Sequence, residues 1–400
     1  MRALTWTAYL LMACEGYLIY VVGFITPYLE RQLAVAPWVA ALPNSALAAG
    51  VAVAGVVADR ATRRFGPRAA VRMWSGLMGL AGVLLAVPVS IAPILVGAFA
   101  FGMSVGGMLV HVNSALGAGP RGGTLLMRAN LWSMTGGLAG PLLLAAAAGS
   151  IGWWFGPLAP VPFLVALVFV LPASPARDVH AATGPGEDVP AVAEGPGEPR
   201  TGHPPPPALP RPYWQTWGFL TLAIGAEFSF VTWGSQVVTA RTGIAITEAT
   251  SLASLYVVGM VAGRLALSAG HGSACRRLAI MRGGTALALV GAGLVWLAPN
   301  PVVAGLGLLL GGLGGSSLYP LAASLALAHA PSAPVRASAR LTTTTAIAIF
   351  CAPLGLGLAT GAVGVTAAWL LVFAMLGAAL LVVLRIPQPR ERPLPAPVGA

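Results

Sequence analysis

The sequence contains few charged residues and no lysine. Charged residues make up 8% of its 400 residues, and every basic residue is an arginine. Soluble domains carry roughly a quarter charged residues and could not cover their surface with so few. Because hydrophobic residues reach 57%, the composition excludes a soluble protein and predicts an all-α membrane protein embedded in the lipid bilayer.

The sequence also lacks the motifs of metal sites and of common enzymes. Cys14, Cys275 and Cys351 show no CxxC or Cys/His spacing, so we expect neither a metal nor another cofactor. No Walker loop, HExxH or GxSxG motif occurs, so ATP does not drive this chain directly. The net charge of +11 is spread over many loops rather than one patch, which argues against a nucleic-acid partner.

Apolar segments of the length needed to cross a bilayer, ~20 residues, recur along the chain. They lie near residues 5–28, 38–58, 69–88, 91–112, 125–149 and 154–172, and then near 214–240, 247–268, 278–297, 301–328, 338–360 and 364–385. We therefore predict 12 transmembrane helices in two six-helix bundles, residues 1–172 and 213–385. Residues 173–212, rich in proline, predict a disordered cytoplasmic linker, and residues 386–400 a cytoplasmic tail.

The arginines support this order of spans. If the N-terminus is cytoplasmic, every arginine except Arg31 and Arg241 falls on the cytoplasmic side of the membrane. The positive-inside rule requires this asymmetry, which a missed or extra span would destroy. We therefore expect a multi-pass protein of the inner membrane with both termini in the cytoplasm.

The two halves repeat one another. Gly55-Val-Val-Ala-Asp59-Arg60 in the first half corresponds to Gly259-Met-Val-Ala-Gly263-Arg264 in the second. Pro141 follows Arg128 by 13 residues, as Pro353 follows Arg340. Parallel repeats of six helices are a known architecture of secondary transporters, whose substrate site lies between the repeats.

The run from Gly55 to Arg64 resembles the cytoplasmic-loop signature of the major facilitator superfamily, G-x-x-x-D-R-x-G-R-[RK], with Thr62 in place of a glycine. The resemblance implies two six-helix bundles that rock about a central site. It also implies a gate at the cytoplasmic face, where an acidic residue would meet arginines and a helix start across the two halves. The candidate gating residues are Asp59, Arg60, Arg63, Arg64, Arg264 and Arg340. Alternatively, these arginines only anchor the topology.

Two acidic residues, Glu15 and Glu227, lie well inside predicted spans. An ionised carboxylate within the membrane costs a few kcal/mol, so such groups are usually protonated, paired or set in a wet cavity. One interpretation is that either residue binds a proton that is exchanged with, or moves with, a substrate. The other is that each carboxyl is held protonated between helices and stabilises their packing.

Polar and aromatic residues within the spans are candidates for a substrate cavity. Aromatic rings with a few amides suit a ligand that is partly polar and partly flat, although Tyr and Trp are also common at membrane interfaces. The candidates are Tyr20, Asn130, Trp132, Trp233, Gln236 and Tyr319.

The segment Gly136-Gly-Leu-Ala-Gly140-Pro141 resembles the GxxxGP signature of drug–proton antiporters, without the glycine pair that usually follows. Glycines allow close approach of helices and proline bends a helix, so Gly136, Gly140, Pro141 and the corresponding Pro353 are candidates for a shared bend. This partial motif favours export.

Together these features predict a secondary active transporter of a small organic solute, proton-coupled and working by alternating access, that exports drug-like compounds or metabolites. Proton-coupled uptake of a sugar or another small metabolite is the alternative. A membrane-embedded transferase or a non-transporting sensor is less expected, since the surface loops carry arginine rather than clustered acids or histidines. We do not expect an enzyme, and the superfamily's fold needs no second copy to form its pathway, so a monomer should suffice.

Overall fold

The computed structural model describes residues 2–117, 122–170, 208–267, 274–331 and 333–387. Every regular element within these ranges is a helix. The first half contains α1 (Arg2–Phe24), α2 (Thr26–Leu33), α3 (Pro37–Phe65), α4 (Pro67–Leu85), α5 (Ile91–Gly117), α6 (Gly122–Ser150), the 3₁₀ helix η1 (Trp153–Leu158) and α7 (Val161–Val170). The second contains α8 (Arg211–Thr242), α9 (Ile246–Leu267), α10 (Ala274–Leu297), α11 (Pro301–Gly315), α12 (Leu318–His329), α13 (Pro334–Val363), α14 (Val365–Ala368) and α15 (Leu370–Arg385).

Nine segments of the described chain are long and apolar enough to cross a membrane, and two shorter apolar segments accompany them. The helix α8 is longer than these spans, at 32 residues, but it carries more polar residues. The chain is therefore a multi-pass membrane protein of helices, as its composition predicts. The number twelve stays a prediction.

Four predicted spans are each built from two consecutive helices. The pairs are α1 with α2, η1 with α7, α11 with α12, and α14 with α15. Proline explains where α2 begins, because Pro27 stands in its first turn, where its missing N–H removes no helical hydrogen bond. The predicted linker, residues 173–212, falls largely outside the described residues, and so does most of the predicted tail.

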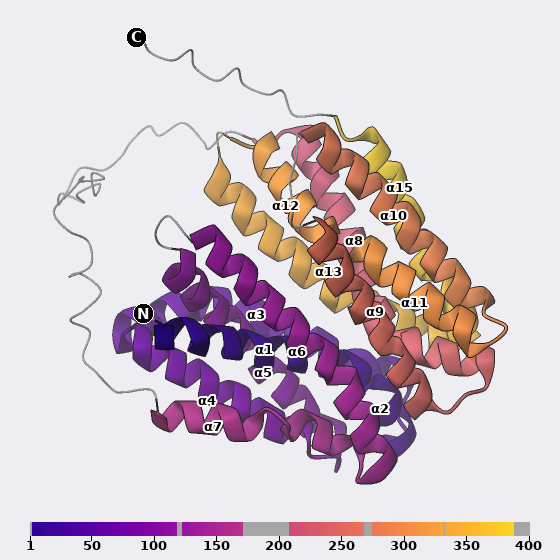
Figure 1. Cartoon of the computed structure of the whole chain (residues 1–400), viewed down its shortest axis with the longest axis horizontal. Coiled ribbons are helices and arrows are strands. Elements are labelled where there is room, and N and C mark those ends of the chain that lie inside the picture. The colour runs from indigo at the N-terminus through magenta and orange to yellow at the C-terminus, as the bar shows by residue number, and fades with distance from the viewer. Residues whose placement is uncertain (1, 118–121, 171–207, 268–273, 332, 388–400) are drawn as a thin grey trace.

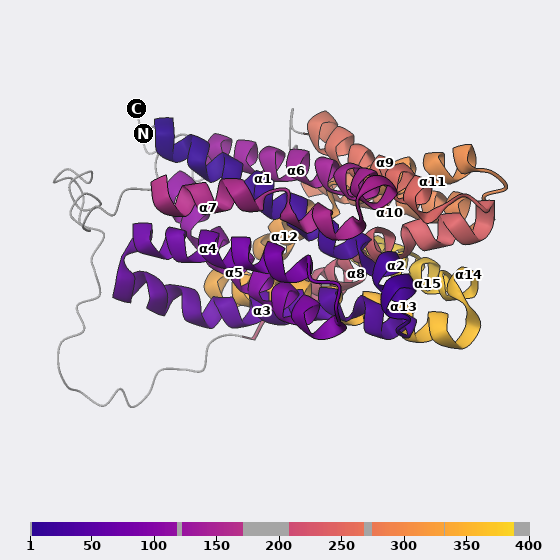
Figure 2. The same cartoon turned by 90° about the horizontal axis from the view of Figure 1, so that it is seen from below.

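The helices form two bundles, which Figures 1 and 2 show side by side: α1–α7 in indigo to magenta and α8–α15 in pink to yellow. Within the first bundle, α3 packs on α5 and α1 on α6; within the second, α10 and α9 pack on α11, and α13 on α8. The bundles join where α13 packs along α3 and α6 packs along α9. The substrate pathway of a two-repeat transporter would run along this joint.

One end of the joint is closed by contacts between the bundles. We call it the α2 end, since α2 lies there and packs on α8. Ser45 on α3 donates to the Phe350 carbonyl of α13 (Oγ to O, 2.9 Å), and a Cβ on Gly357 would come within 2.8 Å of the Trp38 Cα. Figure 1 shows the bundles meeting at this end and leaning apart toward the opposite end, where α3 finishes and α13 begins.

Candidate functional site

Both bundles line a cavity of about 130 Å³. Its lining residues are Gly16, Ile19, Tyr20, Ser133 and Met134 from the first bundle and Glu227, Phe228 and Val231 from the second. The cavity lies where α1, the first helix of one half, passes α8, the first helix of the other. A molecule held here would contact both halves at once.

Glu227 is the acidic residue that lines this cavity. It is half-buried on α8 and faces the buried Tyr20 of α1. The positive charge of Arg264, on α9, acts on both Glu227 and Tyr20. Tyr256 of α9 is stacked on Phe230, with the ring centroids 5.0 Å apart. It also interacts electrostatically with Glu227, Tyr20 and Arg264.

A break between two helices provides a hydrogen-bond acceptor for Arg264. The guanidinium Nε of Arg264 donates to the carbonyl oxygen of Ser316 at 2.9 Å. Ser316 stands between the end of α11 and the start of α12. Carbonyls at a helix end lack an intrahelical partner, so the break supplies an acceptor that a continuous span would not offer. The predicted gating residue Arg264 is thus tied to its own bundle.

Glu15 lies behind the wall of the cavity. Its side chain is 7% exposed, and its Oε2 accepts a hydrogen bond from the Ser133 hydroxyl at 3.2 Å. Because Ser133 itself lines the cavity, one hydrogen bond separates Glu15 from it. Glu15 and Ser133 belong to the same bundle, whereas Glu227 comes from the other.

No family model and no curated protein matches the chain. Several solved structures do. The xylose transporter XylE from E. coli, in an inward open conformation, has a TM-score of 0.73 at 12% identity and covers 98% of this chain and 97% of its own. The nucleoside transporter NupG scores 0.69 at 11% identity, covering 96% and 97%. The transporter FucP, in the outward conformation, scores 0.59 at 15% identity, covering 95% and 100%. FucP is described as a major facilitator superfamily transporter.

This chain has the major facilitator superfamily fold. The cavity of Glu227 lies between the two bundles of this fold, and the bounds of the two halves stay a prediction. In transporters built from such repeats, the substrate site lies at the repeat interface near the middle of the membrane. The cavity of this chain lies at the corresponding interface between its two bundles.

Of the six residues predicted to line a cavity, Tyr20 lines this one. Trp233 is fully buried and donates through Nε1 to the Pro353 carbonyl at 3.0 Å. Gln236 donates to Glu30 of the other bundle. The helical period explains both positions, since residues six and nine positions beyond Glu227 lie roughly 120° and 180° away from its face of the helix.

The other three candidates lie elsewhere. Trp132 is half-buried and packs edge-on against Trp6, with centroids 5.9 Å apart. Asn130 and Tyr319 are exposed, Tyr319 to 42%. None of the three lines the cavity of Glu227.

The predicted gate at the end of α3 is only partly described. Asp59 and Arg63 lie in α3, but their side chains fall outside the described part of the structure. Arg60 and Arg64 are exposed, and the Arg64 guanidinium lies 5.4 Å from the centre of the Phe65 ring. Arg340 is exposed on α13. A contact between Asp59 and Arg340 therefore stays a prediction.

The glycines of the GxxxGP segment pack α6 against α1. A Cβ added to Gly136 would lie 1.9 Å from the Ala13 carbonyl oxygen, and one on Gly140 would lie 3.0 Å from that of Tyr17. Pro141 lies inside α6, as the corresponding Pro353 lies inside α13. Packing within the first bundle thus accounts for the glycine pair.

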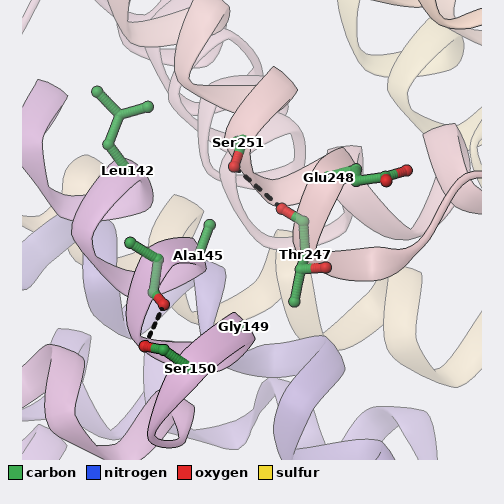
Figure 3. A pocket seen from close by; sticks show the side chains of 8 residues that line it. Leu142, Ala145, Gly149, Ser150, Thr247, Glu248 and Ser251 are labelled. Carbon is green, nitrogen blue, oxygen red and sulfur yellow. Dashed lines mark hydrogen bonds between the residues drawn. The ribbon is translucent and has the colours of Figure 1, made fainter.

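A second hollow, of about 400 Å³, lies between α6 and α9 and is drawn in Figure 3. Its lining residues are Leu142, Ala145, Ala146, Gly149, Ser150, Thr247, Glu248 and Ser251. Glu248 points away from the α6 wall in Figure 3 and accepts from the Ala245 N–H at 3.3 Å, which caps the start of α9. Its polar groups thus serve their own helices, and we assign this hollow no role.

The sequence did not single out Ser133, Tyr28 or Glu30. Ser133 is one of many small polar residues in apolar helices, and nothing local marks its bond to Glu15. Glu30 carried a usable signal, because it is an acidic residue three positions after Pro27, just beyond an apolar span. Among the described residues, no three His, Cys, Asp or Glu side chains gather as a metal site would require.

Proposed function

We propose that this chain is a secondary active transporter of a small organic solute, coupled to protons and working by alternating access. The observation that carries this proposal is the cavity in which Glu227 of one bundle faces Tyr20 of the other. A solute bound there contacts both halves and shifts the equilibrium between their two arrangements to the extent that it binds one of them better.

Glu227 is the residue that we propose to bind the coupled proton. A carboxyl group in a membrane-embedded cavity is costly to keep ionised without a partner, and Arg264 provides a nearby positive charge. Protonation changes the charge of the cavity by one unit at the joint between the bundles. The proton affinity of Glu227 would then differ between the two arrangements of the bundles, as coupling of proton movement to solute movement requires.

We propose an inner-membrane orientation in which the α2 end faces the outside and both termini face the cytoplasm. The two arginines assigned to the outside, Arg31 and Arg241, support this orientation, because both lie at the α2 end. The described conformation would then be closed to the outside. One copy of the chain would suffice, because its own two bundles line the cavity.

Export of a drug-like compound or metabolite is the first form of this function, and uptake of a sugar or other metabolite is the second. The GxxxGP segment that favoured export is explained by packing of α6 on α1, so it no longer distinguishes the two. The similar structures carry nucleosides, xylose and peptides according to their names, which supports a small solute. The direction must come from measurement.

The test uses purified protein in liposomes that contain a pH-sensitive dye, to which pools of labelled candidate solutes are added. We expect solute-dependent proton movement in the wild type and its loss in Glu227→Gln. The matched control is Glu248→Gln, a glutamate that caps α9 outside the cavity. Acidification of the liposome interior would show that protons move with the solute, as uptake requires, and alkalinisation that they move against it, as export requires.

Two results would contradict the proposal. Solute entry without proton movement, equal in the wild type and Glu227→Gln, would make the chain a facilitator and Glu227 a structural residue. Absence of transport for every pool, in protein that binds the same solutes, would favour a non-transporting sensor.

A further inference from the structure

The short helix α2 connects the two bundles at the α2 end through side chains. The Tyr28 hydroxyl donates to the Thr250 Oγ1 of α9 at 3.1 Å. Gln236 Nε2 of α8 donates to Glu30 Oε2 at 3.2 Å. Tyr28 and Glu30 thus each reach a different helix of the other bundle, and these bonds must break when the bundles separate at this end.

Glu30 lies beyond the apolar span Trp6–Phe24 and is half-buried. Burial raises the pKa of its carboxyl above the ordinary glutamate range, against the opposing effects of the Gln236 bond and of Arg31. When the bundles separate here, water reaches Glu30 and the pKa returns toward that range.

Few other ionisable groups surround Glu30. The sequence of α3, which packs on α2, carries none from Pro37 to Ala58. On α8, the basic residue of this end is Arg241, exposed in the last turn. Glu248 on α9 is bound to the start of its own helix. Of the two acidic residues described between the bundles at this end, Glu30 is the one that bonds across them, to Gln236, whereas Glu248 is exposed in the hollow between α6 and α9.

The hydrogen bonding between Glu30 and Gln236 makes the closure of the α2 end depend on protonation of Glu30. An ionised carboxylate can only accept a hydrogen bond from the Gln236 amide. A protonated carboxyl can both accept from Nε2 and donate its own O–H to Oε1, which makes two bonds between the bundles. Protonation also removes the cost of a half-buried negative charge.

We propose that Glu30 is a second proton-binding residue of this protein, protonated while the α2 end is closed and deprotonated when the bundles separate there. The proposal rests on the alternating access of the proposed function, but not on Glu227 or on any solute. It implies that closing this end takes up a proton and that opening it releases one.

The direction of the pH effect follows from the pKa difference. Because closure raises the pKa of Glu30, the stabilisation of the closed arrangement is fully present below the pKa of the open arrangement. This stabilisation is lost as the pH rises through the raised pKa that Glu30 has in the closed arrangement. Across this pH range, the ratio of closed to open molecules falls in total by about tenfold for each unit by which closure raises the pKa of Glu30.

The experiment measures the distance between spin labels across the closure. Labels are placed at Ala36→Cys and Ala240→Cys, both exposed sites, in full-length protein whose three native cysteines are replaced by alanine. The protein is held in nanodiscs without solute, and the pH is raised from about 4, the range of an unperturbed glutamate, to about 8. In the wild type, we expect the long-distance population to grow with pH.

Two variants and one control decide the result. Glu30→Gln keeps a bond to Gln236 without a titratable group, so its distances should stay short at every pH; Glu30→Ala should likewise lose the pH response. The control Glu248→Gln should respond as the wild type does. A response that persists in either Glu30 variant, or a wild type without any response, would overturn the proposal. Neither outcome depends on whether solute transport is found.

Discussion

Ser133 donates a hydrogen bond to Glu15, with Oγ and Oε2 3.2 Å apart, and thereby connects a residue of the cavity wall with a buried carboxyl of the same bundle. Glu227 differs from Glu15 in this respect, since it lies at the joint and faces the other bundle. The sequence does not distinguish these two carboxyls of the predicted spans, but their positions in the structure do. We therefore propose that Glu15 stabilises its own bundle and that Glu227 responds to the motion between the bundles.

Glu15→Gln should therefore leave solute-dependent proton movement close to that of the wild type. The amide keeps the shape of the carboxyl and can still accept from Ser133, so the packing of α1 on α6 is preserved. The measurement is the liposome assay, with Glu227→Gln run in parallel. Loss of proton movement in Glu15→Gln, in protein of normal thermal stability, would instead place Glu15 in the proton pathway.

Ser133→Ala should destabilise the protein. The substitution removes a donor from a carboxyl that is 7% exposed, and leaving a buried acceptor unsatisfied costs about 1–3 kcal/mol. We expect a lower midpoint of thermal unfolding in detergent. The double variant Glu15→Met with Ser133→Ala should recover much of this loss, because replacing both partners by apolar groups removes the unsatisfied atom. Additive losses in the double variant would show that the bond contributes nothing.

Gly136→Ala should be far more damaging than Gly149→Ala, although both glycines lie in α6. A Cβ at Gly136 would meet the Ala13 carbonyl oxygen at 1.9 Å, which forces α6 away from α1, whereas nothing lies within 4 Å of a Cβ at Gly149. Alanine also favours a helix over glycine by about 1 kcal/mol, so Gly149→Ala should be neutral or slightly stabilising. Expression yield and thermal unfolding of the two variants provide the comparison. Equal effects would mean that α1 and α6 do not pack this closely.

The fold could be predicted from the sequence because lipid imposes simple rules on it. Apolar length predicts the helices, arginine placement predicts their orientation in the membrane, and repeated segments predict the two halves. The structure confirms two helical bundles with the major facilitator fold. Thr62, which stands where the superfamily signature has a glycine, makes a contact that such rules do not predict. Its hydroxyl lies 3.2 Å from the His111 Nε2 of α5, a partner 49 positions away that no local pattern indicates.

The site was predicted less well, for two physical reasons. Polar residues that follow Glu227 in sequence were grouped with it, but the helical period turns Trp233 and Gln236 to other faces of α8. Contacts between the bundles, such as Gln236 with Glu30, join residues 206 positions apart. Such pairs depend on how two rigid bundles dock, and neither composition nor periodicity carries that information.

Tyr28→Phe should weaken the closure of the α2 end by the same amount at every pH. The change removes the hydroxyl that donates to Thr250 but keeps the ring, which stacks on Trp153 with centroids 6.4 Å apart. Thr250 still donates to the Ile246 carbonyl, so the loss is one net hydrogen bond, about 0.5–1.5 kcal/mol, or a two- to tenfold lower ratio of closed to open molecules. A tyrosine hydroxyl has an ordinary pKa of about 10, so it stays protonated throughout a titration from about pH 4 to about 8.

The spin-label distances between Ala36→Cys and Ala240→Cys measure this ratio. The matched control is Tyr9→Phe, a buried tyrosine of α1 whose hydroxyl has no hydrogen-bond partner among the described residues. Tyr28→Phe should shift the whole pH curve toward the open arrangement and keep its shape, whereas the Glu30 variants should flatten it. If Tyr28→Phe flattened the curve as well, the pH response would come from the general fit of α2 rather than from the carboxyl. If Tyr9→Phe shifted the curve equally, the Tyr28 hydroxyl would have no specific part in closure.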